Sequence, residues 1–254
     1  MDQVFGLPAG VFWLAMGITL FSGIVKGAIG FAMPLIMISF FSTFLPPEYA
    51  LAGLILPTLT TNLHQTFRDG FAPAREAAWE VRRFILVTII FICVSAPFAQ
   101  YIPHVGFLLL LGIPITLYAG LQLMGVPLAL KLHHQRRAEW ILGTLAGLYG
   151  GISGIWGPPL LVYLLSSDIP KAQNVRIQGV VFLIGSVALL TAHLTTGLLT
   201  GDRLMFSAFL IVPAFVGMLL GFQVYHRLDQ ARFRWWTQLL LVVTGANLVR
   251  QAFM

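Results

Sequence analysis

The hydrophobic and polar positions of this chain separate into long uncharged runs and short charged segments. Asp, Glu, Lys and Arg are absent from six runs, which are residues 49–67, 84–130, 140–167, 177–201, 204–226 and 235–249. Residues 11–45 contain a single charged residue, Lys26. An uncharged apolar run of about 18 residues or more is typical of a helix that lies in a membrane. The pattern therefore predicts an all-α polytopic membrane protein, built as one transmembrane domain over residues 1–254.

The composition argues against a soluble protein. Of the 254 residues, 58% are hydrophobic and 9% are charged, whereas charged residues make up about 25% of ordinary globular domains. The net charge of +6 does not indicate a nucleic-acid partner, because the basic residues gather between the apolar runs, as they do in cytoplasmic loops of membrane proteins. We therefore expect the protein to be embedded in the lipid bilayer and not to bind nucleic acid.

A glycine pattern, G-x3-G-x2-G, occurs in each half of the chain. The two copies lie 127 residues apart, with glycines at Gly23, Gly27 and Gly30 and again at Gly150, Gly154 and Gly157. Prolines follow closely in both copies, and each copy continues through a turn into further apolar segments. Chance coincidence among 25 glycines is the alternative. We predict two homologous halves, residues 1–126 and 140–254, joined by a basic loop at 127–139, an organisation characteristic of secondary transporters.

The glycine-rich segments determine the predicted topology. Residues 11–45 exceed the roughly 20 residues of one crossing but are short for two, so they form either two half-helices or a hairpin that returns to the same side. With one crossing per segment, the loop Lys and Arg residues divide 9 against 5. With a same-side return, they divide 12 against 2, which agrees better with the positive-inside rule. We predict inverted repeats, each with a Gly-rich broken or re-entrant segment plus three transmembrane helices.

Lys26 is the charged residue with the clearest functional meaning. It lies about 22 Å along a helix from either end of its apolar segment, beyond the roughly 6 Å reach of a lysine stem. Burying the ammonium is costly unless an opposite charge, water or an anionic ligand compensates. Because the apolar runs contain no acidic residue, an anion in a cavity is the expected partner. The alternative is a structural lysine bonded to backbone carbonyls at the helix break.

The remaining candidates are glycines and polar residues in or near the apolar runs. The glycines would let an anion approach the backbone, or would pack helices closely. Polar residues on the helix after each glycine pattern, Thr58 among them, would line a cavity or form interhelical hydrogen bonds, whereas an arginine near a loop would anchor the topology. Trp156 would be a cavity wall or a packing residue. The expected substrate-binding residues are Lys26, Gly23, Gly27, Gly30, Asn62, Ser153, Gly154, Trp156, Gly157, Arg176 and His193.

The sequence lacks the constellations that enzymes and metal sites require. No intramembrane carboxylate could orient a catalytic base, and no cluster has the spacing of metal ligands. We therefore expect no catalytic residues, no metal and no cofactor. His64 and His193 are candidates for proton coupling, although both are equally well explained as packed helix residues.

With these motifs, the sequence resembles the sulfite exporter TauE/SafE family of bacterial membrane transporters. The resemblance covers nearly the whole chain and rests on its size, its duplicated halves and the segments SGIVKGAIGFAMP (residues 22–34) and GGISGIWGPP (residues 150–159). It implies a multi-pass transporter of the cell inner membrane that moves sulfite, a sulfonate, sulfoacetate or a related anion. The expected function is thus a gradient-driven secondary transporter of a small anion. The alternatives are a non-transporting membrane subunit and, less favoured, a membrane-embedded enzyme.

Overall fold

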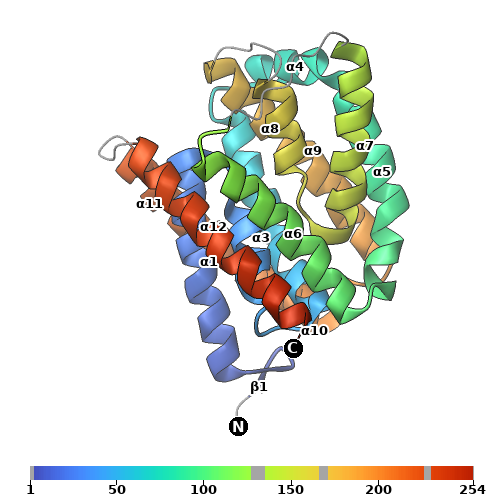
Figure 1. Ribbon diagram of the computed structural model, residues 1–254, viewed down its shortest axis with the longest axis vertical. Helices are drawn as coiled ribbons and strands as arrows, with labels where there is room; N and C mark the ends of the chain where they lie inside the picture. Colours follow the sequence, from blue (N-terminus) through green and yellow to red (C-terminus); the bar gives the residue numbers. More distant parts are fainter. Residues whose placement is uncertain (1–2, 127–134, 166–170, 226–229, 254) are drawn as a thin grey trace. The chain divides into compact units, whose positions relative to one another are not determined.

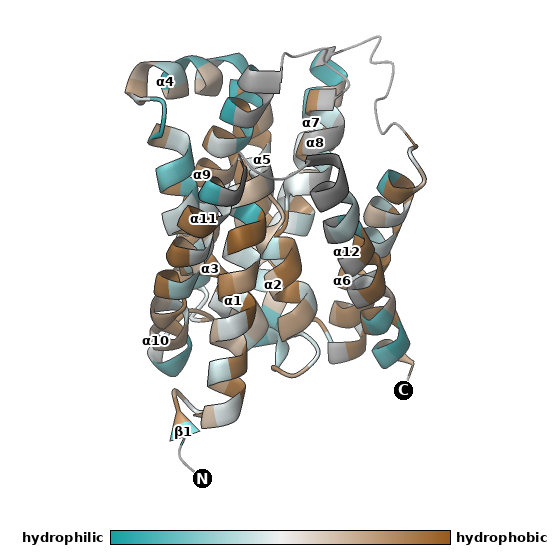
Figure 2. Ribbon diagram, turned by 90° about the vertical axis from the view of Figure 1, so that its left-hand side faces the viewer, coloured by the Kyte–Doolittle hydropathy of each residue, from teal (hydrophilic) through white to brown (hydrophobic). Residues whose placement is uncertain are grey.

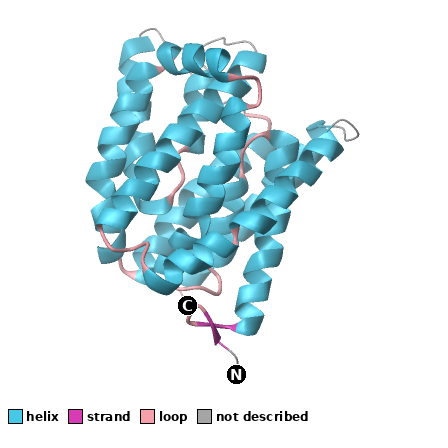
Figure 3. Cartoon of the chain, turned by 180° about the vertical axis from the view of Figure 1, so that it is seen from behind, coloured by secondary structure: helices cyan, strands magenta, loops and turns pink. Residues whose placement is uncertain are grey.

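The chain folds almost entirely into helices (Figures 1 and 3). The computed structural model describes residues 3–126, 135–165, 171–225 and 230–253. In these ranges the strands are limited to a short antiparallel pair before the first helix, β1 (Gln3–Val4) and β2 (Leu7–Pro8). The all-α prediction is therefore confirmed.

Five helical stretches of the described residues are long and apolar enough to cross a membrane. They are Ala9–Ala28, Arg82–Tyr101, Val105–Leu123, Arg176–Thr195 and Gly201–Gln223. Figure 2 shows hydrophobic residues along much of the length of the helices. Large apolar side chains on these stretches are exposed, Ile90 and Val212 by more than half, as expected of helices covered by lipid rather than water. These features agree with the predicted polytopic membrane protein.

The helices follow the same succession twice along the chain: long, short, long, short, long, long. The first succession is α1 (Ala9–Ile29), α2 (Met33–Phe41), α3 (Pro47–Phe67), α4 (Phe71–Glu80), α5 (Arg82–Ser95) and α6 (His104–Leu123), with a 3₁₀ helix, η1 (Ala96–Tyr101), before α6. The second is α7 (Gln135–Ser153), α8 (Gly157–Leu165), α9 (Lys171–Thr195), α10 (Gly201–Phe209), α11 (Ile211–Tyr225) and α12 (Gln230–Ala252).

The chain divides into two compact units, and each unit takes helices from both halves of the sequence. Unit 1 comprises Met1–Pro57, Gln100–Pro127 and Leu198–Met254, whereas unit 2 comprises Thr58–Ala99 and Leu128–Gly197. Unit 1 thus holds α1, α2, the first part of α3, α6, α10, α11 and α12. Unit 2 holds the rest of α3 with α4, α5, α7, α8 and α9. Each unit is described by itself below.

Close helix packing through glycine organises unit 1. α1 packs along α11, and α6 packs along α12. A Cβ added at Gly27 would overlap the Met218 carbonyl oxygen of α11, and one added at Gly221 would overlap the Ile24 carbonyl oxygen of α1. Gly23 makes the same kind of approach to α11. Small residues on both helices therefore bring the two backbones into direct contact, as is common between membrane helices.

Unit 2 repeats this device with different helices. α5 packs along α7, and a Cβ added at Gly147 would lie 2.6 Å from the Thr88 carbonyl oxygen of α5. At Gly151 it would lie 2.6 Å from the Ile92 carbonyl oxygen. The Ser95 hydroxyl strengthens the contact by donating to the Gly147 carbonyl oxygen at 3.1 Å. The long first helix of each succession is thus held to a neighbour through glycine.

In unit 1, α1 and α2 form a hairpin, here called the α1–α2 hairpin. α1 ends at Gly30, whose φ of 83° is left-handed and whose N–H donates to the Lys26 carbonyl oxygen at 2.7 Å. Ala32 is also left-handed, with a φ of 75°. After α2, the Tyr49 hydroxyl at the start of α3 donates to the Phe5 carbonyl oxygen at 3.1 Å. Since Phe5 precedes α1, the chain has returned to the end of the unit at which α1 began.

In unit 2, α7 and α8 form the corresponding α7–α8 hairpin. α7 is followed by Gly154, whose φ is 72° and whose N–H donates to the Gly150 carbonyl oxygen at 2.8 Å. Near the end of α8, the Tyr163 hydroxyl donates to Glu139, which lies near the start of α7, at 3.1 Å. The second glycine-rich segment therefore also enters and leaves at one end of its unit.

The two breaks match in a register that differs from the one suggested by glycine spacing. Gly30 and Gly154 are 124 residues apart, and so are the first residues of α2 and α8. The glycine pattern Gly23, Gly27 and Gly30 also matches Gly150, Gly154 and Gly157 at an offset of 127 residues. Both offsets satisfy G-x3-G-x2-G because the α7 region carries glycines at Gly143, Gly147, Gly150, Gly151, Gly154 and Gly157. The geometry pairs Gly23, Gly27 and Gly30 with Gly147, Gly151 and Gly154.

Candidate functional site

Lys26 is a buried cation in the last turn of α1. Only 2% of its surface is exposed, and its carbonyl oxygen accepts the hydrogen bond from Gly30 that ends the helix. Among the Asp, Glu, Lys and Arg residues whose side chains the structure describes, Lys26 and Glu139 alone are buried. An ammonium in an apolar, span-length helix must be stabilised by polar or negatively charged groups. Such a lysine, beside a break in the helix, is suited to receiving an anion.

The glycines predicted as ligand-binding residues divide between two roles. Gly23 and Gly27 face the backbone of α11, so their contacts serve helix packing. Gly30 instead provides the left-handed residue that ends α1, and Gly154 does the same after α7. Gly157 begins α8, and its nearest neighbour is the Phe182 ring of α9, 3.7 Å from an added Cβ.

The break after α7 in unit 2 is surrounded by polar and aromatic groups. The Ser153 hydroxyl donates to the Tyr149 carbonyl oxygen at 2.7 Å and accepts from the Ile155 N–H at 3.2 Å, so it stabilises the turn itself. Trp156, which follows, is 3% exposed. Its indole nitrogen is buried and has no hydrogen-bond partner among the described residues. Trp156 was expected to be a cavity wall or a packing residue. In the structure its side chain is buried, and its indole N–H makes no hydrogen bond to the described residues.

The polar residues of α3 bind α9 in unit 2. The Asn62 side-chain amide donates to the Phe182 carbonyl oxygen at 3.0 Å and approaches the Ser186 hydroxyl at 3.5 Å. Thr66, one turn later, donates to the Gly179 carbonyl oxygen at 2.8 Å. Thr58, one turn before Asn62, has a buried hydroxyl with no partner in the described part of the chain. The interhelical role anticipated for Asn62 is therefore present, next to a donor that remains unused.

His193 and Arg176 occupy different surroundings on α9. His193 is fully buried, and its Nε2 lies 2.9 Å from the Gly151 carbonyl oxygen, so Nε2 carries the proton and donates. The other ring nitrogen, Nδ1, is buried without a partner among the described residues. Arg176 is half-buried near the start of the helix. Both His64 and His193 were candidates for proton coupling, but they differ in environment, since His64 on α3 is exposed and His193 is buried.

The predicted residues thus fall into two groups. Lys26, Gly23, Gly27 and Gly30 lie in unit 1, whereas Asn62, Ser153, Gly154, Trp156, Gly157, Arg176 and His193 lie in unit 2. Within unit 2, Trp156 packs on Gly185 of α9, next to the Ser186 that Asn62 approaches. Hydrogen bonds and ring contacts therefore connect the break after α7 to α3 and α9.

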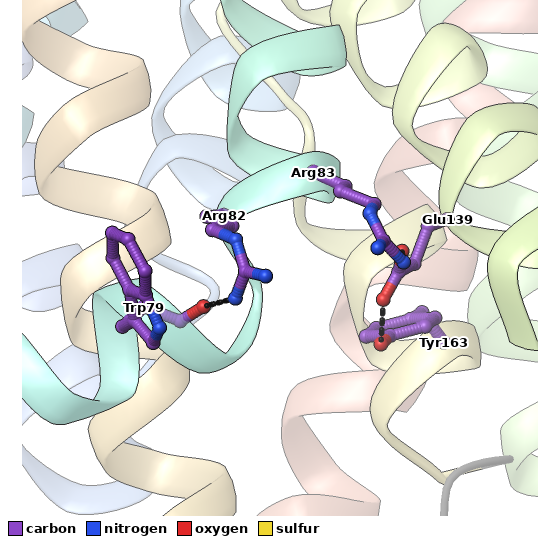
Figure 4. Close-up of polar contacts among 5 residues, drawn as sticks. All are labelled: Trp79, Arg82, Arg83, Glu139 and Tyr163. Atoms are coloured by element: carbon purple, nitrogen blue, oxygen red, sulfur yellow. Dashed lines mark hydrogen bonds and ion pairs between the residues drawn. The ribbon is translucent and has the colours of Figure 1, made fainter.

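A buried charge that the sequence reasoning missed joins three helices of unit 2 (Figure 4). Glu139 of α7 is 6% exposed, accepts a hydrogen bond from Tyr163 of α8, and lies 3.7 Å from the Arg83 guanidinium of α5. Arg82, drawn in the same view, instead donates to the Trp79 carbonyl oxygen at 2.9 Å and covers that indole ring. Glu139 went unnoticed because it lies just outside the uncharged run that begins at residue 140.

Comparison with known proteins gives one family. The family described as "Sulfite exporter TauE/SafE" matches residues 15–248. No curated protein and no solved structure matches the chain.

Proposed function

The chain belongs to the sulfite exporter TauE/SafE family, and we propose that it is a secondary transporter that carries a small anion across the bacterial inner membrane. Family membership makes it a membrane transporter. The substrate class that we propose is sulfite, a sulfonate, sulfoacetate or a related anion. The sequence holds no G-x4-G-K-[ST] nucleotide-binding pattern, so the proposed driving force is an ion or substrate gradient, with protons as the candidate coupling ion.

The observation that carries this proposal is the burial of Lys26 at the break after α1. Its side chain is 2% exposed, and the helix that bears it is one of the five span-length apolar stretches. A compact ammonium can pair with an oxyanion during transport, and the charge of the ligand then offsets the cost of keeping the lysine in an apolar helix. The left-handed Gly30, four residues later, ends the helix beside this charge.

The two hairpins support an inverted-repeat mechanism within this proposal. Each glycine-rich segment returns to the end of the unit from which it started, as judged from Tyr49 in unit 1 and Tyr163 in unit 2. Same-side return is the arrangement that gives the 12-to-2 distribution of basic residues, and it makes the two halves opposite in orientation. We propose that residues 1–126 and 140–254 are these repeats and that they alternate access to the substrate.

Flux of sulfite into proteoliposomes tests the proposal. Wild-type protein should carry sulfite, and flux should respond to an imposed pH gradient if protons are coupled. Lys26→Ala should weaken binding by about 2–5 kcal/mol, the range for removing one partner of a buried charge pair. Arg75→Met, which removes an exposed positive charge on α4, should transport like the wild type. Wild-type affinity in Lys26→Ala with a lowered melting temperature would instead make the lysine structural.

A further inference from the structure

The indole of Trp156 is a buried donor without a partner in the described part of the chain. Its side chain is 3% exposed, and its Nε1 makes no hydrogen bond there. An indole N–H can only donate, so neither a water-free apolar contact nor another donor satisfies it. Buried donors of this kind are rare in folded proteins and call for an explanation. An acceptor brought by a ligand is one.

Two glycines hold the ring in place. A Cβ added at Gly150 of α7 would lie 3.0 Å from the ring atom Cε3. A Cβ added at Gly185 of α9 would lie 2.7 Å from Cε2 and 3.0 Å from Nε1. The indole therefore lies between two helices at positions where any larger residue would displace it, and its N–H edge borders α9. Glycine at both positions therefore leaves the room that the ring occupies.

The helix α9 carries polar contacts to α3 at the residue that follows Gly185. Ser186, the residue after Gly185, donates to the Leu183 carbonyl oxygen at 2.8 Å and lies 3.5 Å from the Asn62 amide. Thr58, one turn before Asn62 on α3, has an unused buried hydroxyl within the described chain. The Thr58 hydroxyl is the one donor of this set without a partner among the described residues, and it could donate to an oxyanion.

When the two breaks are aligned, Trp156 and Lys26 lie on opposite sides of their respective breaks. At an offset of 124 residues, Lys26 corresponds to Gly150, and Trp156 corresponds to Ala32. The first hairpin thus has a large N–H-bearing side chain before its break and a small residue after it. The second hairpin has the small residue first, and the large donor follows and packs on it. Each break carries one large buried donor, although its place in the sequence differs.

We propose that the indole N–H of Trp156 donates a hydrogen bond to an oxygen of the transported anion, which makes Trp156 a specificity-determining residue for oxyanions. This inference rests on the proposed transport function. The indole is neutral, so it would contribute to anion binding through one directional hydrogen bond and not through charge. A sulfite or sulfonate group presents several oxygens in fixed directions that can accept this bond while other oxygens bind elsewhere, whereas chloride is a single spherical acceptor.

Titration of the protein labelled with ¹⁵N-tryptophan tests the inference. Six indole N–H resonances are possible, and the one missing from Trp156→Phe is that of Trp156. Sulfite and methanesulfonate should shift this resonance saturably, and chloride should need a higher concentration to shift it. Trp156→Phe keeps an aromatic ring but removes the donor, so sulfite should bind about 10- to 100-fold more weakly, as expected for a lost hydrogen bond to a charged group.

Two glycines of α9 supply a matched pair of variants. Gly185→Ala places a Cβ against the indole, whereas at Gly179 the nearest atoms, Gln65 Cγ and Thr66 Cα, are 3.5 Å away, which is ordinary contact. Gly185→Ala should weaken sulfite binding and move the Trp156 resonance, and Gly179→Ala should bind as the wild type does. If Trp156→Phe fails to fold, the response of the Trp156 indole resonance to sulfite and the comparison of Gly185→Ala with Gly179→Ala still test the role of Trp156.

The outcomes separate this inference from the transport function. If the wild type carries and binds sulfite while the Trp156 resonance stays unmoved, or while Trp156→Phe binds equally well, the role of Trp156 is overturned and the transport function stands. If the wild type neither binds nor carries sulfite or methanesulfonate, both are overturned. A response to chloride equal to that for sulfite would overturn the oxyanion specificity.

Discussion

Replacing Gly27 with alanine should destabilise the protein, because no space exists for a single added methyl group. The new Cβ would overlap the Met218 carbonyl oxygen and would lie 2.9 Å from both Gly221 Cα and Phe222 N. Each of these is a backbone atom of α11, so no side-chain rotation can relieve the contact. The gaps to Gly221 and Phe222 are about 0.5 Å short of the 3.4 Å at which ordinary contact begins. The two helices must therefore separate.

The expected cost follows from overpacking of tightly packed sites, about 1–3 kcal/mol and occasionally more. Because the added Cβ meets backbone atoms of α11 that cannot rotate away, we expect a cost in the upper part of this range. For a chain of this size, that corresponds to a fall in melting temperature of about 5–10 °C. Gly17→Ala, on the same helix, is the matched control, since an added Cβ at Gly17 has no neighbour within 4 Å. Alanine there should be neutral or slightly stabilising, because it favours the helix.

Thermal unfolding of the two variants in one detergent is the assay. The reasoning predicts a melting temperature for Gly27→Ala clearly below those of the wild type and Gly17→Ala. Equal melting temperatures for the two variants would refute the close approach of α1 and α11. A fall in both would mean that helix α1 tolerates no substitution, and the glycine contact would then explain nothing specific.

Two further predictions concern unit 2 and the topology. Tyr163→Phe removes a hydrogen bond to the buried carboxylate of Glu139 and should cost about 1.5–3 kcal/mol of stability, measured by thermal unfolding; an unchanged melting temperature would mean that the bond contributes nothing. In a background that replaces the exposed Cys93, a cysteine at Glu48 should react with an impermeant thiol reagent from the outside and one at Asp69 only from the inside. Labelling of both from one side would contradict a crossing by α3.

The pattern of charge along the sequence was enough to predict the apolar helices and the burial of Lys26. Uncharged runs identified the helical, membrane-embedded segments, and the single lysine in residues 11–45 is indeed buried. The tryptophans differ in the same way: five that flank apolar segments are exposed by 45% or more, whereas Trp156, inside the second glycine pattern, is 3% exposed. The exposed five are Trp13, Trp79, Trp140, Trp235 and Trp236.

What the sequence could not supply depends on contacts between distant segments. Glu139 is one residue from an uncharged run, and only the fold shows that Tyr163 and Arg83 enclose it. Likewise, spacing alone cannot tell whether Gly27 contacts a ligand or a helix nearly 200 residues later in the chain. The helix ends favour an offset of 124 residues instead of 127, and the sequence could not choose between the two because its glycine spacing satisfies both.

The packing of Gly27 against α11 has a consequence for the neighbouring Lys26. Backbone contact with α11 at Gly23 and Gly27 fixes the last turns of α1, and Lys26 lies between these two glycines in sequence. A lysine has a long, flexible stem, and ordering it for a ligand costs conformational entropy. A rigid backbone and a buried side chain would meet part of that cost before the proposed anion arrives, which is how positioned groups raise affinity. If Lys26 binds the anion as proposed, glycines that pack helices sustain that binding through the residue that they hold.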